Sequence, residues 1–204
     1  MRYLSKNRGT KKRFGALTYR KKSDRPKIKA VLLEDQTLPG IGGRFCAYSE
    51  SFLKPIDEAH IEHFDPRLKD TQADGYENLY VVLPWMNSHK SKKIQKHLPL
   101  LCPFSEERWT RISYEGQIFT WKEGDQEAEN LVTFLGWNKP EVVLSRQNHT
   151  DRILEHLAFC DSKAGLVSYL RKRPDRLSFI TSLLHHLEIE LAELLEPEEK
   201  GDHA

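Results

Sequence analysis

Short apolar runs separated by turn-forming residues dominate the first half of the chain. Each run is brief and either alternating or continuously apolar, which is typical of small strands. Strands are predicted at residues 27–33, 44–48 and 59–64. Residues 79–83 are apolar and β-branched at their centre, which indicates either a strand or a buried approach to a helix. Asn87, a good capping residue, predicts a helix that continues through residue 96 until Pro99 ends it.

Helical periodicity becomes the main pattern beyond residue 103. Residues 111–121 predict a hairpin that turns at Glu115-Gly116. Helices are predicted at residues 126–135, 140–156, 164–171 and 176–195. The last of these carries an apolar stripe at three- and four-residue steps, formed by Leu177, Ile180, Leu184, Leu187, Leu191 and Leu194. Such a stripe indicates either core packing or a surface that binds a partner or a second copy.

Length and composition limit the class of protein. With 204 residues, 30% of them charged, and a mean hydropathy of −0.64, the chain is expected to be soluble and to bury one moderate core. No apolar run approaches the roughly 18 residues that a membrane helix needs, and no apolar segment follows the basic N-terminus as a secretory signal would require. The cysteines, at 46, 102 and 160, are odd in number and widely spaced, which favours a reducing, cytoplasmic location.

Positive charge is concentrated in residues 1–30, although the net charge of the chain is only +2. Asp24 is the only acidic residue of this segment. The basic residues expected to contact nucleic acid are Lys11, Lys12, Arg13, Arg20, Lys21 and Lys22. Because Tyr3, Phe14 and Tyr19 are interleaved with the cations, the pattern favours nucleic-acid contact over a solubilising tail.

Four polar residues around the hairpin expected from residues 59–64 and 79–83 have the chemistry that phosphodiester hydrolysis needs. Glu62 and Asn87 can offer a carboxylate and an amide oxygen, which are ligands that Mg²⁺ prefers, and such an ion neutralises phosphate charge. His63 can act as the general base, because imidazole titrates near working pH. Asn78 can form a hydrogen bond to the other ring nitrogen of His63 and so fix its tautomer. Since Glu62 and His63 are adjacent, they face opposite sides of a regular strand, and the grouping requires a kink near Asp65-Pro66.

Each of these residues also has a purely structural explanation. Glu62 could be an exposed strand carboxylate, and His63 a half-buried histidine. Asn78 and Asn87 could serve only to begin a strand and to cap a helix. The ordered combination of all four nevertheless favours a site.

The same order of residues resembles the HNH (ββα-metal) endonuclease family. Its motif here is Glu-His on one strand, Asn-Leu after a loop, and Asn-x-x-Lys at a helix start. CAYSE at 46–50, IEHFDPR at 61–67, ENL at 77–79 and NSHK at 87–90 are similar to HNH proteins related to the nuclease subunit of Septu antiphage systems, which also occur beside some retrons. GQIF at 116–119 and LGWNKPEVVLSR at 135–146 extend the resemblance, which covers residues 40 to 157.

The resemblance implies an α+β fold with a ββα-metal core and a metal-dependent endonuclease activity. It implies that Glu62 and Asn87 bind Mg²⁺ or Mn²⁺, that His63 is the base, and that Asn78 orients the base. The remaining implied roles are contacts with the substrate phosphate, assigned to Arg67 and Lys90, with His60 as a lesser candidate.

Partners and substrate also follow from the resemblance alone. It implies DNA as the substrate, a cytoplasmic role in antiphage defence, and an ATPase partner of the ABC/SMC type. The apolar stripe at 176–195 and the acidic end of the chain are the surface expected to contact that partner. Two alternatives remain open: a nuclease that cuts RNA such as tRNA, and a nucleic-acid-binding subunit whose nuclease site is silent.

The sequence departs from the family at its structural zinc site. Many relatives carry two Cys-x-x-Cys pairs, whereas only Cys46 remains here, with Ser49, Leu83 and Met86 at the other three positions. Zinc needs about four soft or borderline ligands, so no structural zinc is predicted. A small hydrophobic cluster is expected to brace the hairpin in its place.

Four regions are predicted along the chain. A basic N-terminal arm covers residues 1–30, and the HNH core covers residues 31–102. A hairpin and a mainly helical region follow at residues 103–195, and an acidic tail at residues 196–204 ends the chain.

Overall fold

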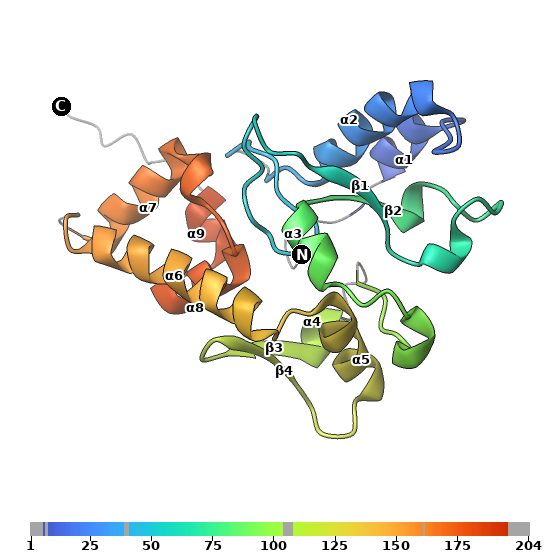
Figure 1. Ribbon diagram of the computed structural model, residues 1–204. Coiled ribbons are helices and arrows are strands. Elements are labelled where there is room, and N and C mark those ends of the chain that lie inside the picture. Colours follow the sequence, from blue (N-terminus) through green and yellow to red (C-terminus); the bar gives the residue numbers. More distant parts are fainter. Residues whose placement is uncertain (1–5, 7, 39–40, 104–107, 161, 196–204) are drawn as a thin grey trace.

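The computed structural model describes residues 6, 8–38, 41–103, 108–160 and 162–195. Within this part of the chain, helices predominate and two small antiparallel sheets complete an α+β fold (Figure 1). Buried side chains form two clusters. One joins the N-terminal helices, the first hairpin and the second hairpin, and the other lies among the C-terminal helices. The predicted acidic tail, residues 196–204, lies outside the described residues.

The basic N-terminal segment contains helices α1 (Arg8–Phe14) and α2 (Arg25–Asp35). The strand predicted at residues 27–33 is therefore wrong. Pro26 lies in the first turn of α2, where its missing N–H has no cost. Ile28 and Leu32, one helical turn apart, are fully buried, so a short helical stripe was mistaken for strand alternation. Helix α2 packs against the first hairpin.

The first hairpin is formed by β1 (His60–His63) and β2 (Leu79–Val82), which confirms the strand predicted at residues 59–64 and the strand alternative for residues 79–83. The strands are antiparallel, with Glu62 opposite Tyr80 and His63 opposite Leu79. The strand predicted at residues 44–48 is wrong, since this stretch contributes only an isolated bridge between Phe45 and Phe52.

Helix α3 (Pro84–His89) follows β2 directly. The predicted helix starts three residues too late and ends too late, because Pro84 opens the first turn and Lys90 has an extended backbone. Asn87 thus lies inside the helix rather than at its cap.

The outer edge of β2 is closed by side-chain and loop contacts instead of a third strand. The buried Gln36 amide donates to the carbonyl oxygens of Phe45 (2.6 Å) and Val81 (2.8 Å), and its oxygen accepts from the Val81 N–H (2.9 Å). The Ala47 N–H also donates to the Val81 carbonyl, at 3.0 Å. Satisfying these buried backbone groups fixes the 45–47 loop against the hairpin.

Between residues 111 and 172 the chain follows its predicted elements closely. The hairpin consists of β3 (Ile112–Glu115) and β4 (Ile118–Trp121), after the short helix α4 (Arg108–Arg111). Helices α5 (Gln126–Leu135), α6 (Pro140–Leu157) and α7 (Lys163–Lys172) come next. The described residues also include short 3-10 helices: η1 (Lys22–Asp24), η2 (Pro66–Leu68), η3 (Tyr76–Asn78), η4 (Ile94–His97) and η5 (Pro174–Arg176).

The single long helix predicted at residues 176–195 is wrong. Two helices, α8 (Ile180–Leu187) and α9 (Leu191–Leu195), are separated at Glu188, whose φ of 51° is left-handed. The apolar stripe nevertheless lies in the C-terminal core, with Leu191 as its least buried member. Core packing therefore explains the stripe, and it is not a free surface for a partner. Among the described helices, none is both long and apolar enough to cross a membrane.

Candidate active site

The hairpin and the helix that follows it bring Glu62 and Asn87 together. Asn87 Nδ2 donates to Glu62 Oε2 at 3.0 Å, across 25 positions of sequence. Glu62 lies near the end of β1, and Asn87 lies one turn into α3. The two side chains that the sequence analysis assigned to a metal are therefore in direct contact.

Lys90 lies against the same carboxylate. Its Nζ forms a close ion pair with Glu62 and donates to the His63 carbonyl oxygen at 2.6 Å. The Lys90 side chain is only 5% exposed. Burial lowers the pKa of its ammonium, while Glu62 acts in the opposite direction. Lys90 thus supplies the positive charge that balances Glu62.

His63 lies on the other side of the strand from Glu62. Its Nε2 is 3.2 Å from Asp74 Oδ2, and the edge of Tyr19 packs on the ring at a centroid distance of 4.7 Å. The His63 and Asp74 side chains are 8% and 3% exposed. Pairing of β1 with β2 stays regular through His63, so the kink that the sequence analysis required is not seen within the strand. Glu62 and His63 face different neighbours, as strand alternation dictates.

Asn78 holds the backbone beyond His63 and does not contact the imidazole through any recorded bond. Its Oδ1 accepts from the Asp65 N–H at 2.7 Å, and its Nδ2 donates to the Asp65 carbonyl at 3.0 Å. The Asn78 carbonyl accepts from the Phe64 N–H at 2.8 Å. Asn78 therefore fixes the chain where it leaves β1.

Asp74 is the residue that sequence reasoning missed. It belongs to the aspartate-containing stretch at residues 70–75, in the loop between β1 and β2. Asp74 Oδ2 also accepts from the Asp70 N–H at 3.0 Å, so the loop holds the carboxylate in place. A buried position for one aspartate of a turn has no signal in the sequence, because the same residue types also serve exposed turns.

Arg67 and His60 are the other candidates for phosphate contact. Arg67 pairs with Asp65 through two donors, Nε at 3.0 Å and Nη2 at 2.7 Å. These bonds hold the pKa of Asp65 below its ordinary value. His60 is exposed and lies 3.4 Å from Glu58. Arg67 is half-exposed beside the exit of β1, whereas His60 is at its start.

Part of the basic segment packs beside this site. Arg20 Nε lies 3.9 Å from Asp70 Oδ1, in the loop that carries Asp74, and Tyr19 contacts His63. Among the cations assigned to nucleic acid, Lys11 pairs with Glu77 at 2.8 Å and Arg13 pairs with Glu34. The remaining three, Lys12, Lys21 and Lys22, are exposed.

Lys6 anchors the start of this segment on the hairpin. Its Nζ donates to the Leu79 carbonyl at 2.6 Å and lies 4.2 Å and 4.1 Å from the ring centroids of Tyr76 and Tyr80. Burial lowers the pKa of Lys6 to about 7. The contact ties the basic segment to the backbone on both sides of Asn78.

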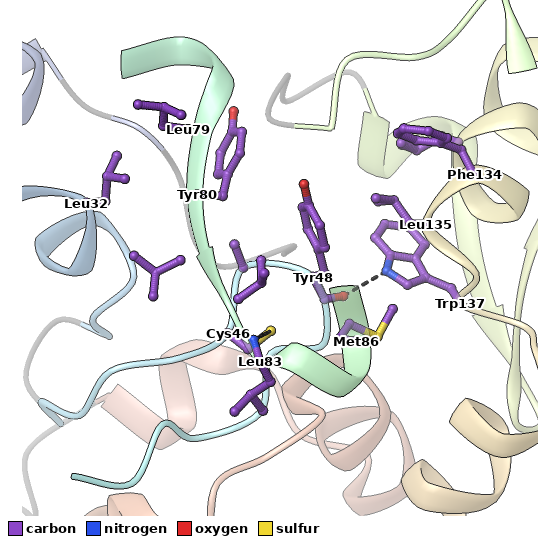
Figure 2. Packing of buried hydrophobic residues seen from close by; sticks show 14 of the residues in the cluster. Leu32, Cys46, Tyr48, Leu79, Tyr80, Leu83, Met86, Phe134, Leu135 and Trp137 are labelled. Carbon is purple, nitrogen blue, oxygen red and sulfur yellow. Dashed lines mark hydrogen bonds between the residues drawn. The ribbon is translucent and has the colours of Figure 1, made fainter. Parts of the chain in front are cut away.

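Buried packing surrounds the four positions considered above for a structural zinc. Cys46, Leu83 and Met86 belong to the first hydrophobic cluster, and Ser49 is also buried. Figure 2 shows Leu83 beside Cys46, whose Sγ accepts from the Leu83 N–H at 3.3 Å. The same view shows Trp137 Nε1 donating to the Tyr48 carbonyl, at 2.7 Å, above Met86. These contacts join the hairpin, α3 and the end of α5.

Chelation is expected to leave the stability of the fold unchanged. A structural zinc would supply folding free energy that EDTA removes, whereas here apolar packing braces the hairpin. We expect EDTA or dipicolinate to shift Tm by less than about 2 °C, a range that corresponds to less than about 1 kcal/mol. Thermal unfolding followed by circular dichroism, together with metal analysis of the purified chain, measures this. A large fall in Tm with release of zinc would contradict it.

The donor set suits a hard cation held in part by water and substrate. Among the described residues, no group of three or more His, Cys, Asp or Glu side chains is gathered as a metal cluster. A Mg²⁺-like ion keeps several waters, so one carboxylate and one amide oxygen suffice to hold it. Because one of these two ligands is an amide, a site of this kind does not require three His, Cys, Asp or Glu side chains. Glu62 and Asn87 are the residues that would hold the ion. Asn87 would have to turn its oxygen, in place of its nitrogen, toward the ion.

Comparisons of the chain with protein-family models, curated proteins and solved structures found no match.

Proposed function

We propose that this protein is a metal-dependent endonuclease with an HNH-type ββα-metal core, which hydrolyses phosphodiester bonds in DNA. The observation that carries the proposal is the contact between Glu62 and Asn87, at 3.0 Å, from a strand and a helix that a buried hairpin aligns. An amide and a carboxylate of this kind, beside an imidazole on the same strand, match the chemistry of one-metal phosphodiester hydrolysis.

The proposed mechanism needs the end of β1 to rearrange, because Glu62 and His63 lie on opposite faces of a regular strand and must act on one phosphate. Glu62 and Asn87 would hold a divalent ion, which would supply neutralisation of the phosphoryl charge and help for the leaving oxygen. His63 accepts the proton of the attacking water. Asp74, bonded to His63 Nε2, fixes the tautomer and stabilises the imidazolium, so Nδ1 is the accepting atom. Asn78 is a positioning residue that fixes the backbone after His63.

Substrate access requires a rearrangement of the N-terminal segment. His63 is covered by Tyr19 and by the Asp74 loop, and Lys90 balances Glu62. Tyr19 must move for a phosphate to approach the imidazole. Lys90 pairs with Glu62 and donates to the His63 and Phe64 carbonyl oxygens, so its ammonium must release one of these three partners to contact the phosphate. The exposed Lys12, Lys21 and Lys22, with Arg20 beside the loop, are suited to hold the nucleic-acid backbone.

The partner and cellular role extend the proposal. A closed site would slow cleavage by the free nuclease in the cytoplasm, and a partner that displaces Tyr19 would raise its activity. We propose an ATPase of the ABC/SMC type in this role, within an antiphage defence complex. The apolar stripe is buried, so the partner must use another surface.

The proposal is tested by cleavage of supercoiled plasmid and of total RNA with Mg²⁺ or Mn²⁺. Cleavage of plasmid alone, abolished by EDTA, is the expected result. Glu62→Gln should weaken Mn²⁺ binding, measured by electron paramagnetic resonance, by at least about 10- to 100-fold, which is the cost of losing even a residue that supports a metal ligand. Its cleavage should fall in parallel.

Glu123→Gln is the matched control, because Glu123 is an exposed carboxylate in the loop after the second hairpin. It should bind Mn²⁺ and cleave like the unsubstituted chain. Cleavage of RNA but not of DNA would show that the substrate is RNA instead of DNA. Salt-dependent binding with no cleavage under either metal, and no Mn²⁺ bound at Glu62, would overturn the nuclease proposal in favour of a silent binding subunit.

A further inference from the structure

A polar cavity of about 370 Å³ lies on α6 and its neighbours, away from the Glu62–Asn87 contact. Helix α6 contributes His149, Arg152, Ile153 and His156, at the one-turn spacing that places side chains on one helix face. The other lining residues are Lys54, Tyr169, Asp175, Arg176 and Ser178. Ser178 Oγ accepts from the Phe52 N–H at 2.9 Å, which holds the loop carrying Lys54 against the end of η5.

Positive charge exceeds negative charge around this cavity. Three permanent cations line it: Lys54, Arg152 and Arg176. The one lining carboxylate, Asp175, is shared, since it lies 3.5 Å from Arg176 Nε and 3.0 Å from Arg173 Nε. Within the described residues, no ion pair is recorded for Lys54 or Arg152. Cations gathered in a concave site without matching carboxylates repel one another, and a bound anion removes that repulsion.

A buried, unpaired nitrogen points to the same kind of ligand. His149 Nε2 has almost no exposed area and no hydrogen-bond partner. A buried polar atom without a partner is unfavourable, because it has lost its hydrogen bonds to water. Burial lowers the pKa of His149, as do the neighbouring charges of Arg152 and Arg176, while a hydrogen bond to the Arg176 backbone acts in the opposite direction. An anion in the cavity would offset the two arginine charges.

The cavity also has an aromatic wall. The rings of His156 and Tyr169 are 4.4 Å apart, with an angle of 39° between their planes, and both residues line the cavity. Its volume lies in the range of sites for small ligands, about 300–1,000 Å³. An aromatic surface beside a cluster of cations suits a molecule that combines a flat ring with phosphate groups.

We propose that this cavity binds a free nucleotide, with its phosphates on Arg152, Arg176 and Lys54 and its base against His156 and Tyr169. The site is separate from the Glu62–Asn87 centre, and the inference does not depend on nuclease activity. A nucleotide bound here would join α6, η5 and the loop of Lys54, and so would connect the C-terminal helices to the region of the first hairpin.

The test is isothermal titration calorimetry with ATP, ADP and AMP in a metal-free buffer, using the full chain. Saturable binding of at least one of these nucleotides is expected. The double variant Arg152→Gln, Arg176→Gln should weaken the binding by about 100-fold, since one charged hydrogen bond is worth about tenfold in affinity. Lys139→Gln, which removes an exposed cation just before α6, is the matched control and should bind like the unsubstituted chain.

Several outcomes would overturn the inference. One is that none of the three nucleotides binds saturably at millimolar concentration. Another is that the double variant, with an unchanged Tm, binds nucleotide as tightly as the unsubstituted chain. Pyrophosphate that binds as tightly as ADP would show a simple anion site without recognition of a base. A single-stranded oligonucleotide that binds where mononucleotides do not would assign the cations to a nucleic-acid track. Because His63→Ala should bind nucleotide normally, failure of the nuclease proposal and failure of this one are distinguishable.

Discussion

Replacing His63 with alanine is expected to lower the rate of metal-dependent cleavage by about 10²–10⁴-fold, the range that a general base contributes. The reason is that the imidazole is the proton acceptor, held by Asp74 at 3.2 Å. Mn²⁺ binding should persist, because Glu62 and Asn87 lie on the other face of the strand and keep their contact. Single-turnover cleavage of a labelled duplex at saturating metal measures the rate, and electron paramagnetic resonance measures the bound Mn²⁺.

His185→Ala provides the control for this substitution. His185 is an exposed imidazole on α8, where it contacts the edge of Tyr114. Its loss should leave cleavage unchanged. Because His63 is buried, the Tm of His63→Ala is measured as well, so that unfolding is not mistaken for lost chemistry. A folded His63→Ala chain that cleaves normally would remove the base from the mechanism and leave Asp74 without the proposed role.

The sequence predicts well those elements whose signals are local. Helix α5 has its predicted bounds because both ends are specified by single residues. The Asp125 side chain accepts from the Ala128 N–H at 3.1 Å, and Gly136 follows in the left-handed conformation. The second hairpin turns at Gly116, whose φ of 60° suits glycine. Caps and turns of this kind act within a few residues, so a sequence window contains the whole cause.

Elements that depend on tertiary contacts are predicted less well. In residues 27–33, alternation and a helical stripe give the same pattern over a few positions, and packing of α2 on β2 decides between them. Residues 44–48 lack regular pairing because the Gln36 side chain occupies the edge of β2. The break between α8 and α9 needs a left-handed backbone at Glu188, and no glycine in the sequence marks that position. Each outcome depends on residues far away in the sequence.

In the candidate site, too, some contacts follow from the order of the elements and others depend on residues far away in the sequence. The contact of Glu62 with Asn87 was predicted, because strand, loop, strand and helix place those two positions together whatever the loop does. The partner of His63 was not predicted. Strand alternation turns the imidazole away from Asn87, toward a loop whose conformation the sequence does not specify, and there Asp74 meets it. Lys90 was expected at a phosphate, and its ammonium instead lies buried against Glu62.

Substituting alanine for Gly136 is expected to destabilise the fold by about 2–5 kcal/mol and to lower Tm by about 4–20 °C. Gly136 has a φ of 69°, which costs a non-glycine residue about 1–2 kcal/mol. An added Cβ would also lie 2.7 Å from the backbone oxygen of His89, at the end of α3. The end of α3 cannot yield easily, because the Ser91 N–H donates to the Phe134 carbonyl at 2.7 Å.

Gly116→Ala separates the conformational cost of the Gly136 substitution from the cost of the contact with His89. Gly116 has a similar φ of 60°, and an added Cβ there meets nothing within 4 Å, so only the conformational cost applies. Urea unfolding of both variants should show a difference of about 1–3 kcal/mol, which is the cost of the contact with His89. Because α3 also carries Asn87, Gly136→Ala should impair Mn²⁺ binding under conditions where the chain remains folded, and Gly116→Ala should not. Equal stability of the two variants would mean that the end of α3 moves freely, and a site built on Asn87 would then lack the rigid support that metal binding needs.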